Sequence, residues 1–296
     1  MIMKGLPIAA FLLLLPVIAS ANAECRQQIL IKNPKGDLKL GAIHEPPKGS
    51  DYSVWFPVIP RAIAFDSQDN IYIGDSVKYR VLKYDKNGNF LNKIPLQKPV
   101  HTKKPELSHE IRTIAVDKND NIYVLNILEY RVEVYSSAGK FLKSIDYFKD
   151  EIDQLDTKKP RNKFTPAKAS VDSEGNVYLL GGKDRKNRPT SGAKYDSTGR
   201  LVLKGVANGA NHDETKMIGA SNFSLDVDIY APDKKLPGKT YIALKVKNKA
   251  NETVNVCNGI DNLAEDENGP AVYLDRGGNM YSFDWNENVI KIEVDK

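Results

Sequence analysis

The stretch "DSQDNIY", residues 66–72, returns three times further along the chain, as "DKNDNIY", "DSEGNVY" and "DRGGNMY". These copies begin at Asp117, Asp172 and Asp275. Each copy places the turn-forming residues Asp and Asn, with Gly in the last two copies, directly before an apolar run. A turn that returns in this way indicates a chain built from repeated structural units.

Whole units align as well as the turns do. Residues 60–94 align without a gap with residues 111–145, at a constant offset of 51 positions, so that Arg61 corresponds to Arg112. Less regular copies occupy three further ranges: 169–205, 222–256 and 270–295. Five repeat units are therefore visible.

Each unit has the pattern of four short strands. In the first unit these strands are "AIAF", "NIYIGD", "YRVLKYD" and "NFLNKI". Apolar and polar residues alternate as in half-buried strands, and no long helical pattern is present. We expect the D-x-x-[DG]-N turn to join the first two strands, with the Asp accepting turn hydrogen bonds and the fourth or fifth residue taking a positive φ. The sequence predicts an all-β fold, a β-propeller of four-stranded antiparallel blades.

The last unit ends without its fourth strand. Residues 29–38, "ILIKNPKGDL", resemble residues 81–90, which form a third-strand-to-fourth-strand hairpin in the predicted first blade. We therefore predict that N-terminal strands join the C-terminal blade and close the propeller. The length of the chain suits five or six blades of roughly 40–50 residues.

The first residues have the pattern of a secretory signal. One lysine precedes an apolar run, and Ala21 and Ala23 supply an A-x-A cleavage site. We expect residues 1–23 to be cleaved and residues 24–296 to form a single domain, secreted or periplasmic. Cys25 and Cys257 are the two cysteines, and in an oxidising compartment they predict one disulfide that links the N-terminus to a point near the last repeat.

The composition argues against several kinds of partner. The formal net charge is +5, but lysines and aspartates are mixed along the whole chain. This mixture does not have the basic block of a nucleic-acid-binding arm. No segment after the signal is apolar enough to span a bilayer. We expect a monomer that neither binds nucleic acid nor crosses the membrane.

The units resemble NHL repeats. Residues 60–91 match that family's pattern at Ile63-Ala64-Phe65-Asp66, Asn70-Ile71-Tyr72, Arg80-Val81 and Phe90-Leu91, and residues 111–142 match it almost as well. The resemblance is partial at 169–201 and 270–294 and weak at 222–256. It implies a propeller, most often a six-bladed one, within the superfamily that includes gluconolactonase-like propellers. It implies no single activity, because propellers host binding scaffolds, lactonases and lyases.

Four polar residues are predicted near the mouth of the central channel. Arg61 and Arg112 come just before the first strands of their units, where two guanidinium groups could bind a carboxylate or phosphate. The favoured alternative is that each arginine pairs with a repeat aspartate or a neighbouring blade. Asp75 and Asn126 follow second strands at equivalent positions. The resemblance to gluconolactonase-like enzymes implies a divalent-ion site for such side chains, for Ca²⁺ or another metal, whereas turn capping is the favoured alternative.

The remaining candidates concern recognition. Tyr52, Trp55 and Phe56 either form an exposed partner-binding patch or pack beneath the N-terminal segment. The four histidines do not have metal-ligand spacing. The sequence therefore favours an exported, non-catalytic scaffold without a cofactor, which binds a protein, peptide or glycan of the cell envelope or extracellular space. The alternative is a metal-dependent, lactonase-like hydrolase or lyase with its site at the channel mouth.

Overall fold

The computed structural model describes residues 25–33, 35–42, 60, 62–97, 111–127, 129–147, 166–181, 192–205, 223–230, 241–248 and 253–260, and most of 263–294. The predicted signal, residues 1–23, lies outside them. Their regular structure is almost entirely β-strand, with one 3-10 helix, η1 (Gly36–Leu38). Within the described ranges no helix has the length and apolar character needed to cross a membrane.

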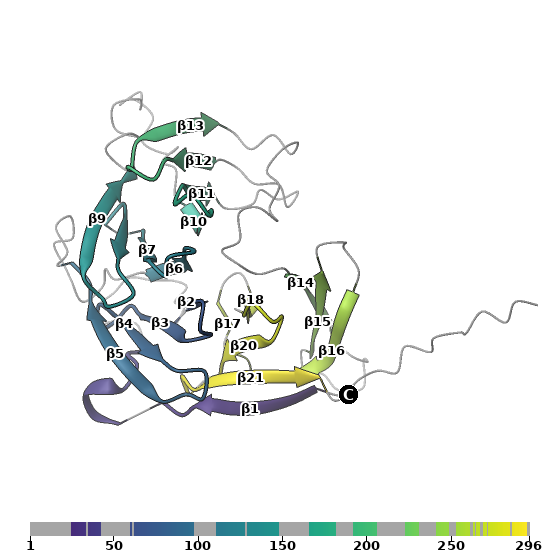
Figure 1. The fold of residues 1–296 in the computed structure, drawn as a ribbon. Helices are drawn as coiled ribbons and strands as arrows, with labels where there is room; N and C mark the ends of the chain where they lie inside the picture. The colour runs from purple at the N-terminus through teal and green to yellow at the C-terminus, as the bar shows by residue number, and fades with distance from the viewer. Residues whose placement is uncertain are drawn as a thin grey trace, which may run out of the picture.

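The chain folds as a β-propeller, in which antiparallel sheets are arranged around a common centre (Figure 1). The first blade consists of β2 (Ala62–Phe65), β3 (Ile71–Asp75), β4 (Arg80–Tyr84) and β5 (Phe90–Pro95). The second consists of β6 (Ile111–Val116), β7 (Ile122–Asn126), β8 (Arg131–Tyr135) and β9 (Phe141–Asp146). The third consists of β10 (Pro166–Val171), β11 (Val177–Gly181), β12 (Gly192–Tyr195) and β13 (Leu201–Gly205).

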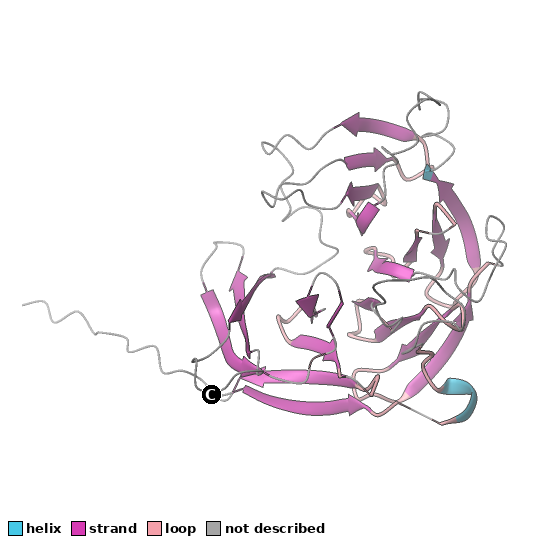
Figure 2. Ribbon diagram, turned by 180° about the vertical axis from the view of Figure 1, so that it is seen from behind, coloured by secondary structure: helices cyan, strands magenta, loops and turns pink. Residues whose placement is uncertain are grey.

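The second half of the chain is less regular. A three-stranded sheet contains β14 (Phe223–Tyr230), β15 (Tyr241–Asn248) and β16 (Thr253–Ile260). A short ribbon of β17 (Glu265–Asp266) and β18 (Gly269–Pro270) follows it. The closing blade contains β19 (Tyr273–Leu274), β20 (Met280–Phe283), β21 (Val289–Val294) and β1 (Cys25–Ile31). Figure 2 shows the same sheets from behind.

The N-terminal strand completes the C-terminal blade, as the sequence predicts. β1 pairs antiparallel with β21, so that Cys25 lies opposite Val294 and Ile29 lies opposite Ile290. The prediction of a two-stranded hairpin over residues 29–38 is wrong. β20 and β21 already supply the second and third strands, so only one position is vacant in the sheet, and the chain after β1 turns into η1 instead.

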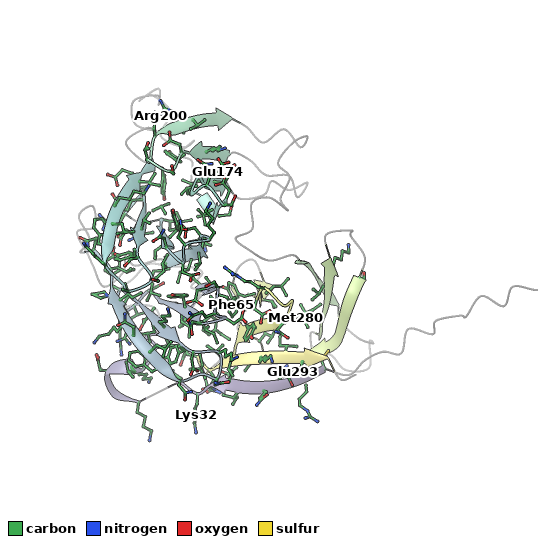
Figure 3. All side chains as sticks on the ribbon, viewed as in Figure 1. Lys32, Phe65, Glu174, Arg200, Met280 and Glu293 are labelled. Atoms are coloured by element: carbon green, nitrogen blue, oxygen red, sulfur yellow. The ribbon has the colours of Figure 1, made fainter. Side chains whose placement is uncertain are left out.

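The hydrophobic core is divided among the joints between neighbouring sheets. One cluster joins the closing blade to the first blade, a second joins the first blade to the second, and a third joins the second to the third. A fourth joins the three-stranded sheet to the closing blade. Phe65 and Met280 lie in these packed layers, whereas Lys32 and Arg200 lie at the periphery (Figure 3). Each sheet is therefore held mainly by its neighbours.

The repeated turn has the predicted geometry. Asp66 Oδ1 accepts hydrogen bonds from the backbone N–H groups of Gln68 and Asn70, at 3.0 and 2.9 Å. The fourth residue, Asp69, has φ = 60°. Asp66 Oδ2 accepts a further bond from the Tyr72 hydroxyl at 3.0 Å. The same tyrosine-to-aspartate bond is present in the other three copies, at 3.3, 3.0 and 3.0 Å.

Candidate binding face

The alternation of strand direction separates two ends of each blade. Links between the first and second strands, and between the third and fourth, lie at one end, which we call the turn end. In the first two blades these links are the tight turns 66–70, 85–89, 117–121 and 136–140. Links between the second and third strands, and between blades, lie at the opposite end. This connection end receives the long segments 32–61, 96–110 and 147–165.

Three of the four residues predicted at the channel mouth are described by the structure, and all three belong to the connection end. Arg112 is half-buried at the start of β6, and Asp75 and Asn126 are the last residues of β3 and β7. The first strands line the centre as expected, because β6 contacts both β2 and β10. Arg61 lies outside the described residues, as does the predicted aromatic patch of Tyr52, Trp55 and Phe56. Both belong to the connection between β1 and β2.

Asp75 is completely buried and is bonded within the chain. Its Oδ1 atom accepts hydrogen bonds from the backbone N–H groups of Gly41 and Lys78, both at 3.1 Å. Its Oδ2 atom accepts a bond from Arg80 Nε at 2.9 Å. These contacts cap the turn after β3 and attach the N-terminal segment to the first blade. The geometry matches the turn-cap interpretation of Asp75.

Asn126 occupies the equivalent position in the second blade and is also completely buried. Its Oδ1 atom accepts a hydrogen bond from the Glu129 backbone N–H at 3.2 Å, which repeats the cap formed by Asp75. Its Nδ2 atom donates to the hydroxyl of Tyr79 in the first blade at 2.6 Å. Burial, together with the charge of Glu133, raises the pKa of Tyr79, so this hydroxyl stays protonated. The pair therefore connects the two blades.

A buried ionic network surrounds this joint. Arg131 is the repeat equivalent of Arg80, which pairs with Asp75. The second blade has Asn126 at the position of Asp75, so Arg131 needs a different carboxylate partner. Glu133 is that partner, and its Oε1 atom accepts a bond from Arg131 Nε at 2.8 Å. The carboxylate of Glu129 lies 3.8 Å from Arg131. The carboxylate that pairs with the arginine therefore lies on the third strand of the second blade, whereas in the first blade it lies at the end of the second strand.

Tyr135 and the chain after β5 complete the network. The Tyr135 hydroxyl donates to Glu133 Oε2, and the backbone N–H of Gln97 donates to both groups, at 3.0 and 3.1 Å. Glu133, Tyr135 and Tyr79 are not among the site residues predicted from the sequence. A usable signal is present: Glu133 replaces Leu82 at a repeat position that is otherwise apolar, and an isolated charge there requires a buried partner.

Within the described part of the chain, no group of three or more His, Cys, Asp or Glu side chains is placed to hold a metal ion. Binding of Ca²⁺ at Asp75 and Asn126 would have to displace the intramolecular bonds described above. Both groups therefore act as structural elements in this conformation.

The cysteines lie near the closing blade. Cys25 begins β1, and Cys257 lies in β16 opposite Leu244. Strands β1 and β16 are in contact. Their proximity is compatible with the predicted Cys25–Cys257 bond, and the pairing stays a prediction until it is measured.

No protein-family model matches the sequence, and no curated protein matches it significantly. Among solved structures, the chain is similar to a protein of Bacteroides fragilis NCTC 9343 described as exported, at 12% identity and a TM-score of 0.50, over 94% of this chain and 98% of that one. It is also similar to a streptogramin B lyase, at 10% identity and a TM-score of 0.35, over 80% of this chain. The chain covers 65% of that lyase.

A virginiamycin B lyase from Staphylococcus aureus is a further similar structure, at 8% identity and a TM-score of 0.35, over 78% of this chain and 69% of that one. At these identities the similarities concern the fold alone. The site residues of this chain must therefore be interpreted from its own contacts.

Proposed function

We propose that the protein is an exported, monomeric β-propeller of the NHL-repeat type. It acts by binding a protein, peptide or glycan of the cell envelope through its connection end. The observation that carries this proposal is that the polar side chains described at that end already make hydrogen bonds within the chain. Asp75 and Asn126, the residues best placed for a metal-dependent reaction, are buried and bonded to their own turns and to neighbouring segments.

The unequal lengths of the links support the choice of face. Tight turns close the turn end of the first two blades, whereas the blade-to-blade connections enter and leave at the connection end. Long connections on a rigid scaffold are the usual carriers of recognition, because they vary without disturbing the core. Tyr52, Trp55 and Phe56 belong to one of these connections.

A binding experiment tests the proposal. The protein without residues 1–23 is immobilised and exposed to an envelope extract. A captured component is then purified and titrated against the parent protein and against two variants. We expect Trp55→Ala to weaken binding at least about tenfold, because a buried aromatic anchor typically contributes 2 kcal/mol or more. The matched control is Asn87→Ala in an exposed turn at the turn end, which should bind as the parent does. Equal loss in both variants, or no saturable component, would contradict the proposal.

Metal analysis distinguishes the alternative function. A metal-dependent hydrolase or lyase should contain a stoichiometric divalent ion that is lost in Asp75→Asn and Asn126→Ala. A binding scaffold should retain its partner after dialysis against a chelator. A stoichiometric ion lost in both variants would favour the enzyme.

A further inference from the structure

An arginine holds the chain after β1 on the first blade. Arg80 donates hydrogen bonds to the Lys39 carbonyl and to the Asp75 carboxylate, both at 2.9 Å. The same carboxylate accepts the backbone N–H of Gly41 at 3.1 Å. Leu40, between Lys39 and Gly41, is 1% exposed. We call this set of an arginine, a carboxylate and a bonded chain segment an arginine clamp.

A second arginine clamp holds the chain after β5 on the second blade. Arg131 donates to the Gln97 carbonyl at 3.3 Å and to the Glu133 carboxylate at 2.8 Å. This carboxylate accepts the backbone N–H of Gln97 at 3.1 Å. Gln97 follows the buried Leu96, as Gly41 follows a buried leucine in the first clamp. The two clamps therefore bind corresponding points of the chain.

The two clamps take their carboxylates from different strands. Asp75 ends β3, whereas Glu133 lies within β8. Capping of the turn after the second strand does not need either charge, because the neutral Asn126 caps that turn in the second blade. In both blades the charged group pairs with the arginine and also binds the incoming chain. Attachment of that chain is therefore the common result of the two arrangements.

The third blade does not have the residues of a clamp. The repeat positions of the aspartate, the arginine and the glutamate hold Gly181, Ser191 and Ala193. Strands β10–β13 nevertheless form a four-stranded sheet with the same strand order as the first two blades. The blade fold therefore does not depend on a clamp, and the presence of clamps in two blades calls for another explanation.

Both clamps lie at the connection end, where the proposed binding face is. Gly41 closely precedes the residues of the connection that contains Trp55, and Gln97 closely precedes those of the connection to β6. A recognition segment that is fixed before it meets its partner binds more tightly, because less conformational entropy is lost on binding.

We infer that the two arginine clamps are positioning elements of the binding face. The first fixes the point at which residues 43–61 leave the first blade, and the second does the same for residues 98–110 on the second blade. The inference rests on the proposed function, since it assigns these segments to recognition. Asp75 and Glu133 are 0% exposed, and Arg80 is 4% exposed. Separating such a buried pair leaves an uncompensated charge, so each clamp stays closed in the folded protein.

Moving the carboxylate within the first blade tests the clamp. Asp75→Asn removes the charge and keeps an acceptor for the turn, as Asn126 does in the second blade. Adding Leu82→Glu places a carboxylate at the repeat position of Glu133. The Tyr84 hydroxyl, buried without a hydrogen-bond partner, is then available as a donor to the new carboxylate.

Amide hydrogen exchange measures the attachment directly. We expect the Gly41 amide to exchange at least about fivefold faster in Asp75→Asn, because a neutral acceptor replaces a charged one. Asp75→Asn combined with Leu82→Glu should regain most of this protection. The control is Asp66→Asn, the same chemical change at a buried aspartate of the turn end, which should leave Gly41 at the parent rate.

The exchange rates can contradict the clamp in three ways. An unchanged Gly41 rate in Asp75→Asn, equal acceleration in Asp66→Asn, or no regain in the combined variant would each overturn it. If Asp75→Asn does not fold, Arg80→Lys replaces it, with the same acceleration expected at Gly41. A lysine lacks the planar fork that binds the carboxylate and the Lys39 carbonyl together.

Binding affinity tests the positioning role. The component captured by the parent protein should bind at least about threefold more weakly to Asp75→Asn, because the segment is less ordered before binding. Affinity should return in the variant that also has Leu82→Glu. Unchanged affinity in Asp75→Asn, with Trp55→Ala weakening binding, would overturn the positioning role. Absence of any saturable component would instead contradict the proposed function, and the Gly41 exchange rates would still decide whether the clamp exists.

Discussion

One carboxylate organises each repeated turn. In the first blade Asp66 binds two backbone N–H groups, the Asn70 amide and the Tyr72 hydroxyl, and it pairs with Lys83 at 3.0 Å. The side chain therefore fixes both the turn and a tyrosine that is buried between two blades. This explains why the tyrosine returns with the turn in all four copies.

Two equivalent tyrosines provide a matched pair of variants. The Tyr135 hydroxyl donates a hydrogen bond to Glu133. Tyr84 occupies the same repeat position in the first blade, but its hydroxyl is buried without a partner. The reason is that the first blade has Leu82 at the position of Glu133. We expect Tyr135→Phe to lower the free energy of unfolding by about 1–3 kcal/mol, because the buried carboxylate loses a donor. Tyr84→Phe should be neutral or stabilising.

Urea unfolding of both variants measures this difference. Both substitutions remove one oxygen from a ring of the same size, so packing effects cancel in the comparison. An equal loss of stability in the two variants would contradict the assigned network.

At the scale of elements, each turn between a third and a fourth strand packs against the fourth strand of the preceding blade. Gly139 approaches Ile94 of β5, and Gly199 approaches Ile145 of β9. Gly88 approaches Leu30 and Ile31 of β1 in the same way. β1 is therefore a fourth strand in its contacts as well as in its hydrogen bonds, although it comes from the other end of the chain.

The stability cost of replacing a glycine at such a contact can be compared with the cost of replacing a glycine that has no close neighbour. Gly88 has φ = 84°, and a Cβ atom there would collide with the Leu30 carbonyl oxygen. Gly36 has φ = 72° but no atom within 4 Å of such a Cβ. We expect Gly36→Ala to cost about 1 kcal/mol for its backbone angle alone, and Gly88→Ala to cost clearly more because β1 must also shift. Thermal unfolding compares the two, and equal costs would show that β1 does not pack as described.

At the scale of the whole molecule, the N-terminal segment repeats a joint between blades. Arg80 donates to the Lys39 carbonyl at 2.9 Å, and Arg131 donates to the Gln97 carbonyl at 3.3 Å. Leu40 and Leu96, which adjoin these carbonyls, are both buried in clusters between blades. The segment after β1 is thus held on the first blade as the segment after β5 is held on the second.

A disulfide between Cys25 and Cys257 would hold the closing strand to the adjacent sheet. Mass spectrometry without reductant should find the two cysteine peptides linked. Cys25→Ser should lower stability by up to about 4 kcal/mol, because so long a loop is then unconstrained in the unfolded chain. Two free thiols in the protein purified without reductant would contradict the pairing, and in that case Cys25→Ser should leave the melting temperature unchanged.

Acid should destabilise the propeller through its turn aspartates. Burial acts to raise the pKa values of Asp66 and Asp172, but bonds from Asn70, Lys83 and Asn176 outweigh it and hold both pKa values below the usual range. These groups therefore stabilise the fold fully above the unfolded pKa of about 3.9 and lose that contribution as pH falls through their folded values. Unfolding measured from pH 6 to pH 2 should show this loss. Asp66→Asn should have a shallower pH dependence than the parent, and an unchanged slope would contradict the assignment.

The repeats were readable from the sequence because their signals are local. An Asp that caps its own turn, a glycine at positive φ and a strand with alternating polarity act within a few residues, and they are enough to predict the blades, their turns and the missing last strand. The number of strands that the N-terminal segment contributes was harder to predict. Residues 29–38 look like a hairpin, but the number of vacant strand positions in a distant sheet decides that only one strand pairs.

The roles of the polar residues were decided by tertiary structure. The sequence alone shows that Asp75 and Asn126 occupy equivalent positions. Only the folded chain brings Gly41 to one of them and Tyr79 to the other, and it assigns Glu133 to an arginine whose expected partner is absent. Local propensity sets strands and turns, whereas a buried charge is satisfied by whichever partner the packing of neighbouring blades places within hydrogen-bonding distance.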